Sequence, residues 1–298
     1  MNTPPAHAVV VGIDTSPNAE QALDWAADEA ARRALPLHIA HAWAMTPYQL
    51  PAAERGDIAQ DYIHAAQTLL GQAQDRVRGR HPELEVSTEV LNRGAVPGLV
   101  AAAKNADLLV VASRGHNRLA STLLGSVSLG LSAHAPCPVV VIKDHPGSAP
   151  AGGDAGSDGA VVLGAAPGQA PEPVAFAFAE AARRSVPLRV VRTWMYPQAY
   201  PGVIAVPPGE EITRTREEAA DLADVLATAR KEFPDVQVDQ RVLLDEADAA
   251  LVDASKGASL LVLGAERHQR RFSMPIGPIT HRVLHHAHCP VAVVPHTG

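Results

Sequence analysis

The sequence predicts an α/β protein of two tandem domains, each a five-stranded parallel sheet with helices on both faces. Two observations predict this fold class: one sequence unit occurs twice, and within each unit short apolar segments alternate with segments of helical periodicity. The length of 298 residues also suits two domains of about 150 residues. An apolar fraction of 47% and a charged fraction of 19% are typical of a soluble globular chain, and no apolar run reaches the ~18 residues of a membrane span.

The duplication is visible as a constant spacing between matched residues. They lie 152 positions apart along most of the chain, as in the pairs Gly12 and Gly164, Lys104 and Lys256, Gly125 and Gly277, and Cys137 and Cys289. An earlier block, AARRALPLHIAHAW, returns as AARRSVPLRVVRTW at a spacing of 151, because the second copy has lost one residue near its start. Chance does not produce such collinearity, so the two halves indicate a duplicated unit.

The segment between the copies, HPGSAPAGGDAGSDG, is rich in Gly, Ser, Ala and Asp. Such a composition buries too little apolar surface to order itself and is typical of a flexible linker. The sequence therefore predicts a first domain at residues 1–144, a linker at residues 145–158 and a second domain at residues 159–298.

Strands and helices are expected in alternation through the first copy. The run VVVGI has the continuous apolar character of a parallel strand covered on both faces. Ser16 offers an N-cap for the first helix, with Pro17 at its first position. The later elements expected are the strand LHIAHA, a helix marked by Ala66, Leu69, Leu70, Ala73 and Val77, a strand at Leu84 to Leu91, a short helix opened by Gly94 and Pro97, a strand at Asp107 to Ala112, a helix from about Leu123 to Ala133, and the strand VVVI.

This alternation implies a right-handed, doubly wound, Rossmann-like sheet in each copy. In such sheets ligands bind beyond the carboxyl ends of the strands, where the strand order reverses. Asp14, Ala42 and the loop after Ala112 are the corresponding positions of the first copy. Asp14, just past the first strand, is placed to accept a hydrogen bond from a ribose hydroxyl.

The segment ASRGHNRLASTLLGSVS, which starts at Ala112, is the stretch most suggestive of chemistry. After a buried strand and the polar turn SRGHN, Gly125 and Ser126 open the final helix. A loop leading to a helix N-terminus directs backbone N–H groups and positive partial charge at an anion. Ser126 and Ser128 can donate hydroxyl bonds to phosphate, and Arg114 can add charge. The residues alone leave two interpretations open, a phosphate site or a tight turn followed by an N-capped helix.

Both copies resemble the universal stress protein (UspA) family. The segments VVVGIDTSPNAEQAL and ADLLVVASRG carry the resemblance, together with a glycine motif. The family's nucleotide-binding variety shows G-x2-G-x9-G-[ST] after its fourth strand. Here the motif reads Ala112-x2-Gly115-x9-Gly125-Ser126, so an alanine, the mildest replacement, stands at the first glycine.

The resemblance implies that the first copy binds ATP, with or without Mg²⁺. It implies that Asp14 contacts the ribose, that the backbone at Ala42 faces the adenine, and that the end of the motif surrounds the phosphates. The cofactor-binding residues expected on this basis are Gly12, Ile13, Asp14, Ala42, Ala112, Ser113, Arg114, Gly115, His116, Gly125, Ser126, Val127 and Ser128.

The second copy departs further from the motif. It reads Gly264-x2-Arg267-x9-Gly277-Pro278, which restores the first glycine but loses the second glycine and the serine. Pro278 also removes a backbone N–H, and Ala166 stands where the first copy has its aspartate. We expect a degenerate site kept for packing. The alternative is an altered pocket in which Arg267, Arg270 and Arg271 bind another anion.

Other motifs have both structural and functional interpretations. His281 and His285 have the i, i+4 spacing of a zinc pair, but no acidic or cysteine cluster in the nearby sequence completes a site, so exposed or interface histidines are expected. Cys137 and Cys289 each precede a proline before a strand and are expected to be buried rather than a redox pair.

Each copy also contains a long proline-containing loop, and a tryptophan precedes it. The segments at residues 45–58 and 195–212 contain several prolines and are either lids over a pocket or simple connections. Trp43 and Trp194 close matching strands, and core or subunit contacts are expected for them.

Charge and motifs exclude several function classes. A net charge of −7 without a basic run argues against a nucleic-acid-binding surface. The N-terminal segment lacks the features of a signal peptide, so a cytoplasmic location is expected. The GxxxxGK[ST] phosphate loop and the kinase motifs are absent from the sequence, and Asp14 is the only obvious acid beside the expected pocket.

The leading hypothesis is an ATP-binding regulator of a stress response that is not an enzyme, with at most slow ATP hydrolysis and with no catalytic residue assigned. Two alternatives stay open: a weak ATPase, and a nucleotide-independent interaction module that acts through protein partners. The resemblance also implies pairing of the final strands of the two domains in an intramolecular pseudo-dimer, and it leaves a homodimer open.

Overall fold

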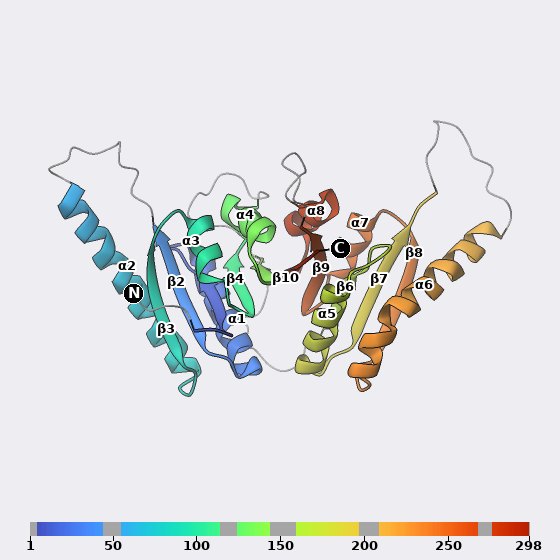
Figure 1. Cartoon of the computed structure of the whole chain (residues 1–298), viewed down its shortest axis with the longest axis horizontal. Helices are drawn as coiled ribbons and strands as arrows, with labels where there is room; N and C mark the ends of the chain where they lie inside the picture. Colours follow the sequence, from blue (N-terminus) through green and yellow to red (C-terminus); the bar gives the residue numbers. More distant parts are fainter. Residues whose placement is uncertain are drawn as a thin grey trace. The chain divides into compact units, whose positions relative to one another are not determined.

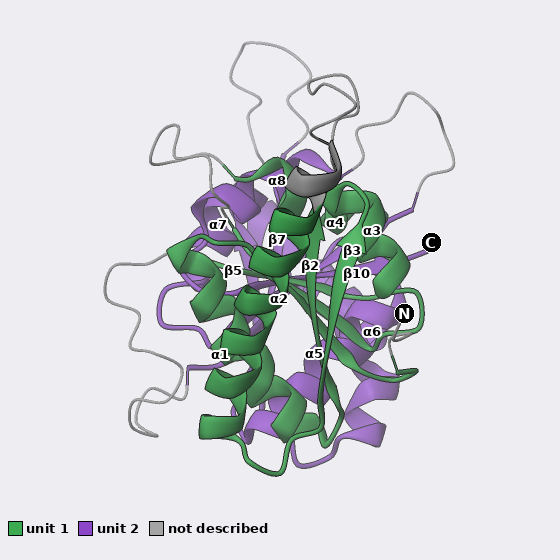
Figure 2. Ribbon diagram, turned by 90° about the vertical axis from the view of Figure 1, so that its left-hand side faces the viewer, with its two compact units in different colours: residues 1–153 green, residues 154–298 purple. Residues whose placement is uncertain are grey.

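A computed structural model describes residues 5–43, 55–113, 124–143, 159–196, 209–267 and 276–297, with side chains from residue 60 onward in the second of these segments. The chain divides into two compact units, residues 1–153 and 154–298 (Figure 2). The division falls within the segment that the sequence predicts to be a linker, which itself lies outside the described residues.

In the described part of unit 1, five parallel strands form a sheet in the order β3-β2-β1-β4-β5 (Figure 1). The elements are β1 (Val9–Gly12), α1 (Pro17–Arg33), β2 (Leu37–Trp43), α2 (Arg55–Arg80), β3 (Val86–Asn92), α3 (Ala95–Ala102), β4 (Leu108–Ala112), α4 (Ser126–His134) and β5 (Val139–Ile142). The predicted parallel α/β fold is therefore confirmed for this unit. Helix α2 begins well before Ala66, and α4 begins at Ser126 rather than near residue 123.

The core of unit 1 lies on both faces of this sheet. The strand runs Val9–Val11 and Leu108–Val110 are fully buried, as expected for parallel strands covered by helices. Helices α1 and α2 contact each other and one face, whereas α3 and α4 contact each other and the opposite face. The predicted apolar stripe of α1 is confirmed, because the buried positions include Ala19, Ala22, Leu23, Ala26, Ala27 and Ala30.

Helix α1 starts and ends with features that the sequence only partly predicts. Ser16 stands at the N-cap position, and Pro17 follows it, as predicted. In this described segment the Ser16 side chain makes no capping bond to the helix backbone, because its hydroxyl donates to Asp14 instead. At the other end, Ala34 adopts the left-handed conformation, with φ 52°. Its counterpart Ser185 does the same at the end of α5, with φ 55°. Both units thus close this helix without glycine.

Unit 2 repeats the architecture. In its described part, five parallel strands form a sheet in the order β10-β9-β6-β7-β8. The elements are β6 (Val161–Gly164), α5 (Pro171–Arg184), β7 (Leu188–Trp194), α6 (Glu210–Glu232), β8 (Val238–Leu244), α7 (Ala247–Ala254), β9 (Leu260–Glu266), α8 (Pro278–His286) and β10 (Val291–His296). Each unit therefore reverses its strand order at one point, between β1 and β4 and between β6 and β9.

The helix pairs α3–α4 and α7–α8 are packed by different means. In unit 1, a Cβ added to Gly130 of α4 would stand 2.8 Å from Val96 Cγ2 of α3, so the helices meet through a bare backbone. In unit 2 the corresponding positions are Arg282 and Asp248, which form an ion pair at 2.5 Å. Burial pushes the pKa of Asp248 up, but the hydrogen bonds from Arg282 and from the backbone outweigh it and leave the pKa below its ordinary value.

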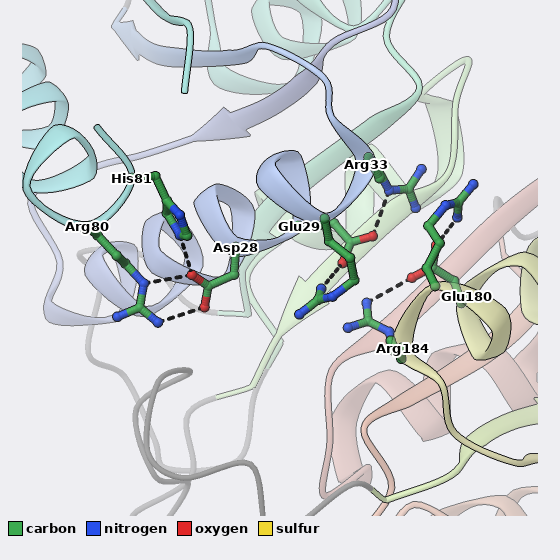
Figure 3. Close-up of polar contacts among 9 residues, drawn as sticks. Asp28, Glu29, Arg33, Arg80, His81, Glu180 and Arg184 are labelled. Atoms are coloured by element: carbon green, nitrogen blue, oxygen red, sulfur yellow. Dashed lines mark hydrogen bonds and ion pairs between the residues drawn. The ribbon is translucent and has the colours of Figure 1, made fainter. Parts of the chain in front are cut away.

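A buried glutamate lies near the end of α1 in unit 1 and near the end of α5 in unit 2 (Figure 3). Glu29 has a fully buried carboxylate that accepts from Arg33 Nε at 2.6 Å and from the arginine before it at 2.6 Å. Glu180 is equally buried and accepts from Arg184 at 2.8 Å and from the preceding arginine at 2.6 Å. Paired arginines at i+3 and i+4 compensate the desolvation of each carboxylate.

A second set of charges joins α1 to the end of α2. Arg80 donates two parallel bonds to Asp28, at 2.7 and 2.8 Å, and His81 Nε2 lies 2.7 Å from the same carboxylate (Figure 3). Bidentate geometry makes this one of the stronger kinds of surface ion pair. No helix among the described residues is long and apolar enough to cross a membrane.

Candidate functional site

The carboxyl ends of β1 and β4 lie side by side, where the strand order of unit 1 reverses (Figure 1). Gly12 is paired with Val111 in the register of these strands. Asp14 therefore follows one strand end, and Ser113 follows the neighbouring one. This is the location at which open α/β sheets bind ligands.

Asp14 is held in a fixed orientation by the turn that leads into α1. Its Oδ1 atom accepts from the backbone N–H of Ser16 at 2.9 Å and from the Ser16 hydroxyl at 2.5 Å. The carboxylate is half-buried at the edge of the sheet. Because both bonds end on Oδ1, the carboxylate keeps acceptor capacity at Oδ2.

The N-terminus of α4 is fastened to the end of β4 through one carbonyl group. Gly125 N–H donates to Ser113 O at 2.8 Å, and the buried hydroxyl of Ser128 lies 3.2 Å from the same oxygen. Ser128 Oγ also donates to Gly125 O at 2.9 Å. Ser113 N–H in turn donates to Ile142 O on β5 at 2.7 Å. These bonds set the helix N-terminus beside the end of Asp14's strand.

Two groups of the expected phosphate site have acceptors within the protein. The Ser128 hydroxyl and the Gly125 N–H both point at protein carbonyls, so in this structure neither serves as a donor to a ligand. The groups that can do so are the first-turn amides of Ser126, Val127 and Ser128, which an α-helix leaves without intrahelical acceptors. Ser126 is exposed, so its hydroxyl can still reach a ligand.

The neighbouring strand β2 adds a residue that the sequence analysis did not single out. His41 Nδ1 lies 2.8 Å from Ile13 O, so that nitrogen is the protonated donor. Ile13 N–H in turn donates to Ala40 O at 3.0 Å. Ala42, the residue expected to face adenine, follows His41 and is half-buried. In the sequence, His41 could have been noticed as a polar residue that interrupts an apolar strand near its carboxyl end.

Gly12 has a packing role. A Cβ at this position would lie 2.7 Å from Leu99 Cδ1 and 3.3 Å from Val111 Cγ1. Its duplicate, Gly164, would meet Leu263 and Leu251 at 2.8 and 3.0 Å. Since the same contacts recur in a unit without the aspartate, both glycines allow close packing of a helix on the sheet.

Several predicted positions lie outside the described residues. They are Arg114, Gly115 and His116 of the motif loop, together with Arg270, Arg271 and most of the two loops predicted to be either lids or simple connections. Ile13 and Ser113 are buried, and Ala112 is half-buried at the end of β4.

In unit 2 the corresponding strand ends are filled by internal hydrogen bonds. Ala166 occupies the aspartate position, and its N–H donates to Gln169 Oε1 at 3.0 Å. Arg267 N–H donates to His296 O at 2.9 Å. Pro278 is the first residue of α8, which therefore offers one amide fewer than α4. The missing aspartate and the missing amide are the reasons that a degenerate site is predicted here.

The histidine and cysteine motifs show no assembled metal or redox site. The rings of His281 and His285 lie 4.6 Å apart, and no group of three metal-ligating side chains occurs among the described residues. Cys137 and Cys289 are both buried, as expected for residues that precede the last strand of each unit.

Each unit therefore has the doubly wound α/β architecture, with its candidate site at the carboxyl ends of adjacent strands. The sequence profile of the universal stress protein family matches residues 6–143 and 161–295, and the chain belongs to this family. The resemblance seen in the sequence is thus confirmed for both units.

Relatives and solved structures match either the whole chain or about half of it. Universal stress protein Rv2623 of Mycobacterium tuberculosis is 34% identical over 302 residues, covering 96% of this chain and 95% of the relative. A universal stress protein structure from Archaeoglobus fulgidus has a TM-score of 0.66 at 14% identity, covering 97% and 98% of the two chains. A universal stress protein solved in complex with cAMP is 28% identical over 46% of this chain and 97% of its own, with a TM-score of 0.38.

Proposed function

We propose that unit 1 binds an adenine nucleotide, with ATP as the expected ligand, and that the protein acts as a nucleotide-dependent regulator in a stress response. The observation that carries the proposal is the placement of α4. Its first-turn amides are fixed, through Ser113 O, at the end of β4, next to the strand that Asp14 follows. Family membership supports the stress-related role.

The chemistry of the two groups suits the two ends of a nucleotide. Helix amides and the positive end of the helix dipole favour phosphate oxygens. Asp14, with Oδ1 already bonded, can accept a ribose hydroxyl at Oδ2. The proposal assigns no catalytic residue, since one carboxylate does not make up the base, metal ligand and cationic clamp of phosphoryl transfer.

Calorimetric titration of the full chain with Mg-ATP tests this proposal. We expect one site per chain. Gly125→Glu should abolish binding, because it places a carboxylate at the N-terminus of α4, where the φ of −68° accepts any side chain. The matched control is Gly277→Glu in unit 2, where an added Cβ meets nothing within 4 Å and binding should be unchanged.

Other outcomes would contradict the assignment. If both glutamate variants bind like the wild type, nucleotide does not occupy the α4 site. If the wild type shows no binding, the protein belongs with nucleotide-independent interaction modules. Steady phosphate release that falls in Asp14→Asn, which keeps the Oδ1 acceptor, would instead indicate a weak ATPase.

A further inference from the structure

A pocket of about 580 Å³ opens at the amino ends of β6, β7 and β8, at the opposite end of the unit 2 sheet from the degenerate site. Its volume falls in the range of roughly 300–1,000 Å³ that small-molecule sites occupy. The lining includes Arg189, Lys256, Gln237, Asp239 and the backbone of Gly257. This wall therefore presents cationic and polar groups rather than an apolar surface.

Arg189, on β7, is an incompletely satisfied cation in this wall. Its Nε is buried and has no hydrogen-bond acceptor among the described residues. The nearest charge partner is Asp239 Oδ2 at 3.5 Å, and this oxygen already accepts from Arg241 Nε at 3.0 Å. A guanidinium N–H buried without an acceptor is unfavourable, and a ligand oxygen would satisfy it.

Lys256 supplies a second cation from the end of α7. Its Nζ lies 2.8 Å from Asp253 Oδ1, and its side chain is 61% exposed. An ammonium group has three donors, so two remain after this bond. The next residue, Gly257, has φ +69°, a conformation that favours glycine and brings bare backbone to the pocket.

Asp239 limits which anions suit the pocket. Its carboxylate is 48% exposed and lines the same space as the two cations. A bare oxyanion would be attracted by Arg189 and Lys256 but repelled by this carboxylate. A ligand with both a phosphate and hydroxyl donors complements all three charges.

We propose that this pocket binds a small phosphomonoester of a polyol, with its phosphate on Arg189 and Lys256 and a hydroxyl group donating to Asp239. The site is independent of the nucleotide site proposed for unit 1, because every residue lining it belongs to unit 2.

The same position of unit 1 is built differently, which supplies matched controls. His38 stands in place of Arg189 and is fully buried, with Nδ1 2.9 Å from Ser87 Oγ and Nε2 3.3 Å from Glu89 Oε2. Burial lowers the pKa of His38 despite the nearby Glu89, so the neutral ring is favoured. Lys104 is conversely retained at the position of Lys256.

The test is an NMR titration of the ¹⁵N-labelled full chain carrying Gly125→Glu, which removes phosphate binding at α4. The probes are ribose 5-phosphate and inorganic phosphate. We expect saturable shifts of the Gly257 and Ala160 amides. Lys256→Met and Arg189→Met should each weaken binding about tenfold or more, whereas Lys104→Met should leave it unchanged.

A third comparison separates the phosphate contact from the hydroxyl contact. Asp239→Asn should weaken ribose 5-phosphate more than inorganic phosphate. The proposal is overturned if neither probe shifts these amides at millimolar concentration, or if Lys256→Met binds as tightly as Lys104→Met. Because Lys256 is exposed, its replacement tests the site even if Arg189→Met fails to fold. Nucleotide binding by the wild type has no bearing on either result.

Discussion

The second strand carries different chemistry in the two units near its carboxyl end. In unit 1, the half-buried His41 bonds one backbone carbonyl, and Ala66 is the α2 residue at the matched helix position. In unit 2, the equivalent Arg192 is almost fully buried and bonds Glu218 of α6 at 2.6 and 2.7 Å. Polar groups at this end of unit 2 are therefore bonded to each other, which leaves them less able to contact a ligand.

The difference extends to the aromatic residues that follow. Tyr62, which is 57% exposed, stacks on Trp43 with ring centroids 5.4 Å apart and an interplanar angle of 1°. The residue at the position of Tyr62 in unit 2 is Arg214, which bonds the buried Glu218 at 2.9 Å. Trp194 of unit 2 instead contacts Tyr196, with ring centroids 5.0 Å apart. The duplicated strands thus each keep an aromatic pair, while the helix opposite them carries an ion-pair network in unit 2.

The largest expected effect comes from breaking this network. Glu218→Ala should destabilise unit 2 by about 3–5 kcal/mol, because Arg192 would be left buried without its carboxylate. Chemical denaturation of the full chain, followed by a probe in each unit, measures the loss. The double variant Arg192→His/Glu218→Ala installs the residues of unit 1 and should recover much of the stability. A double variant as unstable as the single one would show that the charge is not the cause.

A second contrast lies within unit 1, between two serines of α4. Ser128→Ala should cost about 1 kcal/mol of stability, because its hydroxyl fastens the helix to Gly125 O and Ser113 O, and it should also weaken nucleotide binding. Ser126→Ala should weaken binding with no loss of stability, since Ser126 is exposed. Thermal unfolding and calorimetry of both variants make the comparison. Wild-type stability in Ser128→Ala would contradict the anchoring role.

His38 and Arg189 occupy matching positions at the amino ends of β2 and β7. Because only His38 titrates near neutral pH, the stability of unit 1 is expected to depend on pH at this position. Burial lowers the pKa of His38 below 6.5, so the unfolded chain takes up a proton that the folded chain resists. The contribution of His38 to the free energy of unfolding is therefore complete above about pH 6.5, and it is lost as the pH falls toward the lower pKa of the folded state. His38→Gln should flatten this acid limb in urea titrations at successive pH values. An unchanged slope would exclude His38 as its source.

The smallest effect is expected where the two units agree. Ala34→Gly and Ser185→Gly should each stabilise the chain by about 0.5–1 kcal/mol, because glycine adopts positive φ without the steric cost of a Cβ. Equal gains would confirm that the two helix ends are equivalent. Ala30→Gly, inside α1, serves as the opposite control and should destabilise.

Much of the fold was predictable from particular segments. The apolar runs VVVGI and DLLVVA require cover on both faces, and the constant spacing between copies transfers that conclusion to unit 2. The start of α2 was missed because residues 60–65, which include Tyr62, are exposed and carry no apolar stripe that would reveal a helical period.

The site was predictable only in part. Asp14 follows from its place after the first strand, but the direction of the Ser128 hydroxyl depends on where Ser113 O lies, which is set by the packing of α4 on β4. Gly12 is a further example, because the closeness of Leu99 to its backbone is not visible in the sequence. Side-chain neighbours across elements decide such roles, and spacing along the chain does not contain them.

The unlike packing of α3 on α4 and of α7 on α8 bears on the inheritance of the chain. Long repeats in a gene invite unequal crossing-over, which would exchange segments between the copies. A product that joined α7 to α4 would place Asp248 opposite the glycine of α4. The carboxylate of Asp248 would then lack the ion pair that it forms with Arg282. A product that joined α3 to α8 would force an arginine side chain onto Val96. Each recombinant would lose the contact that its parent unit makes, so the divergence of this contact disfavours exchange between the two halves of the gene.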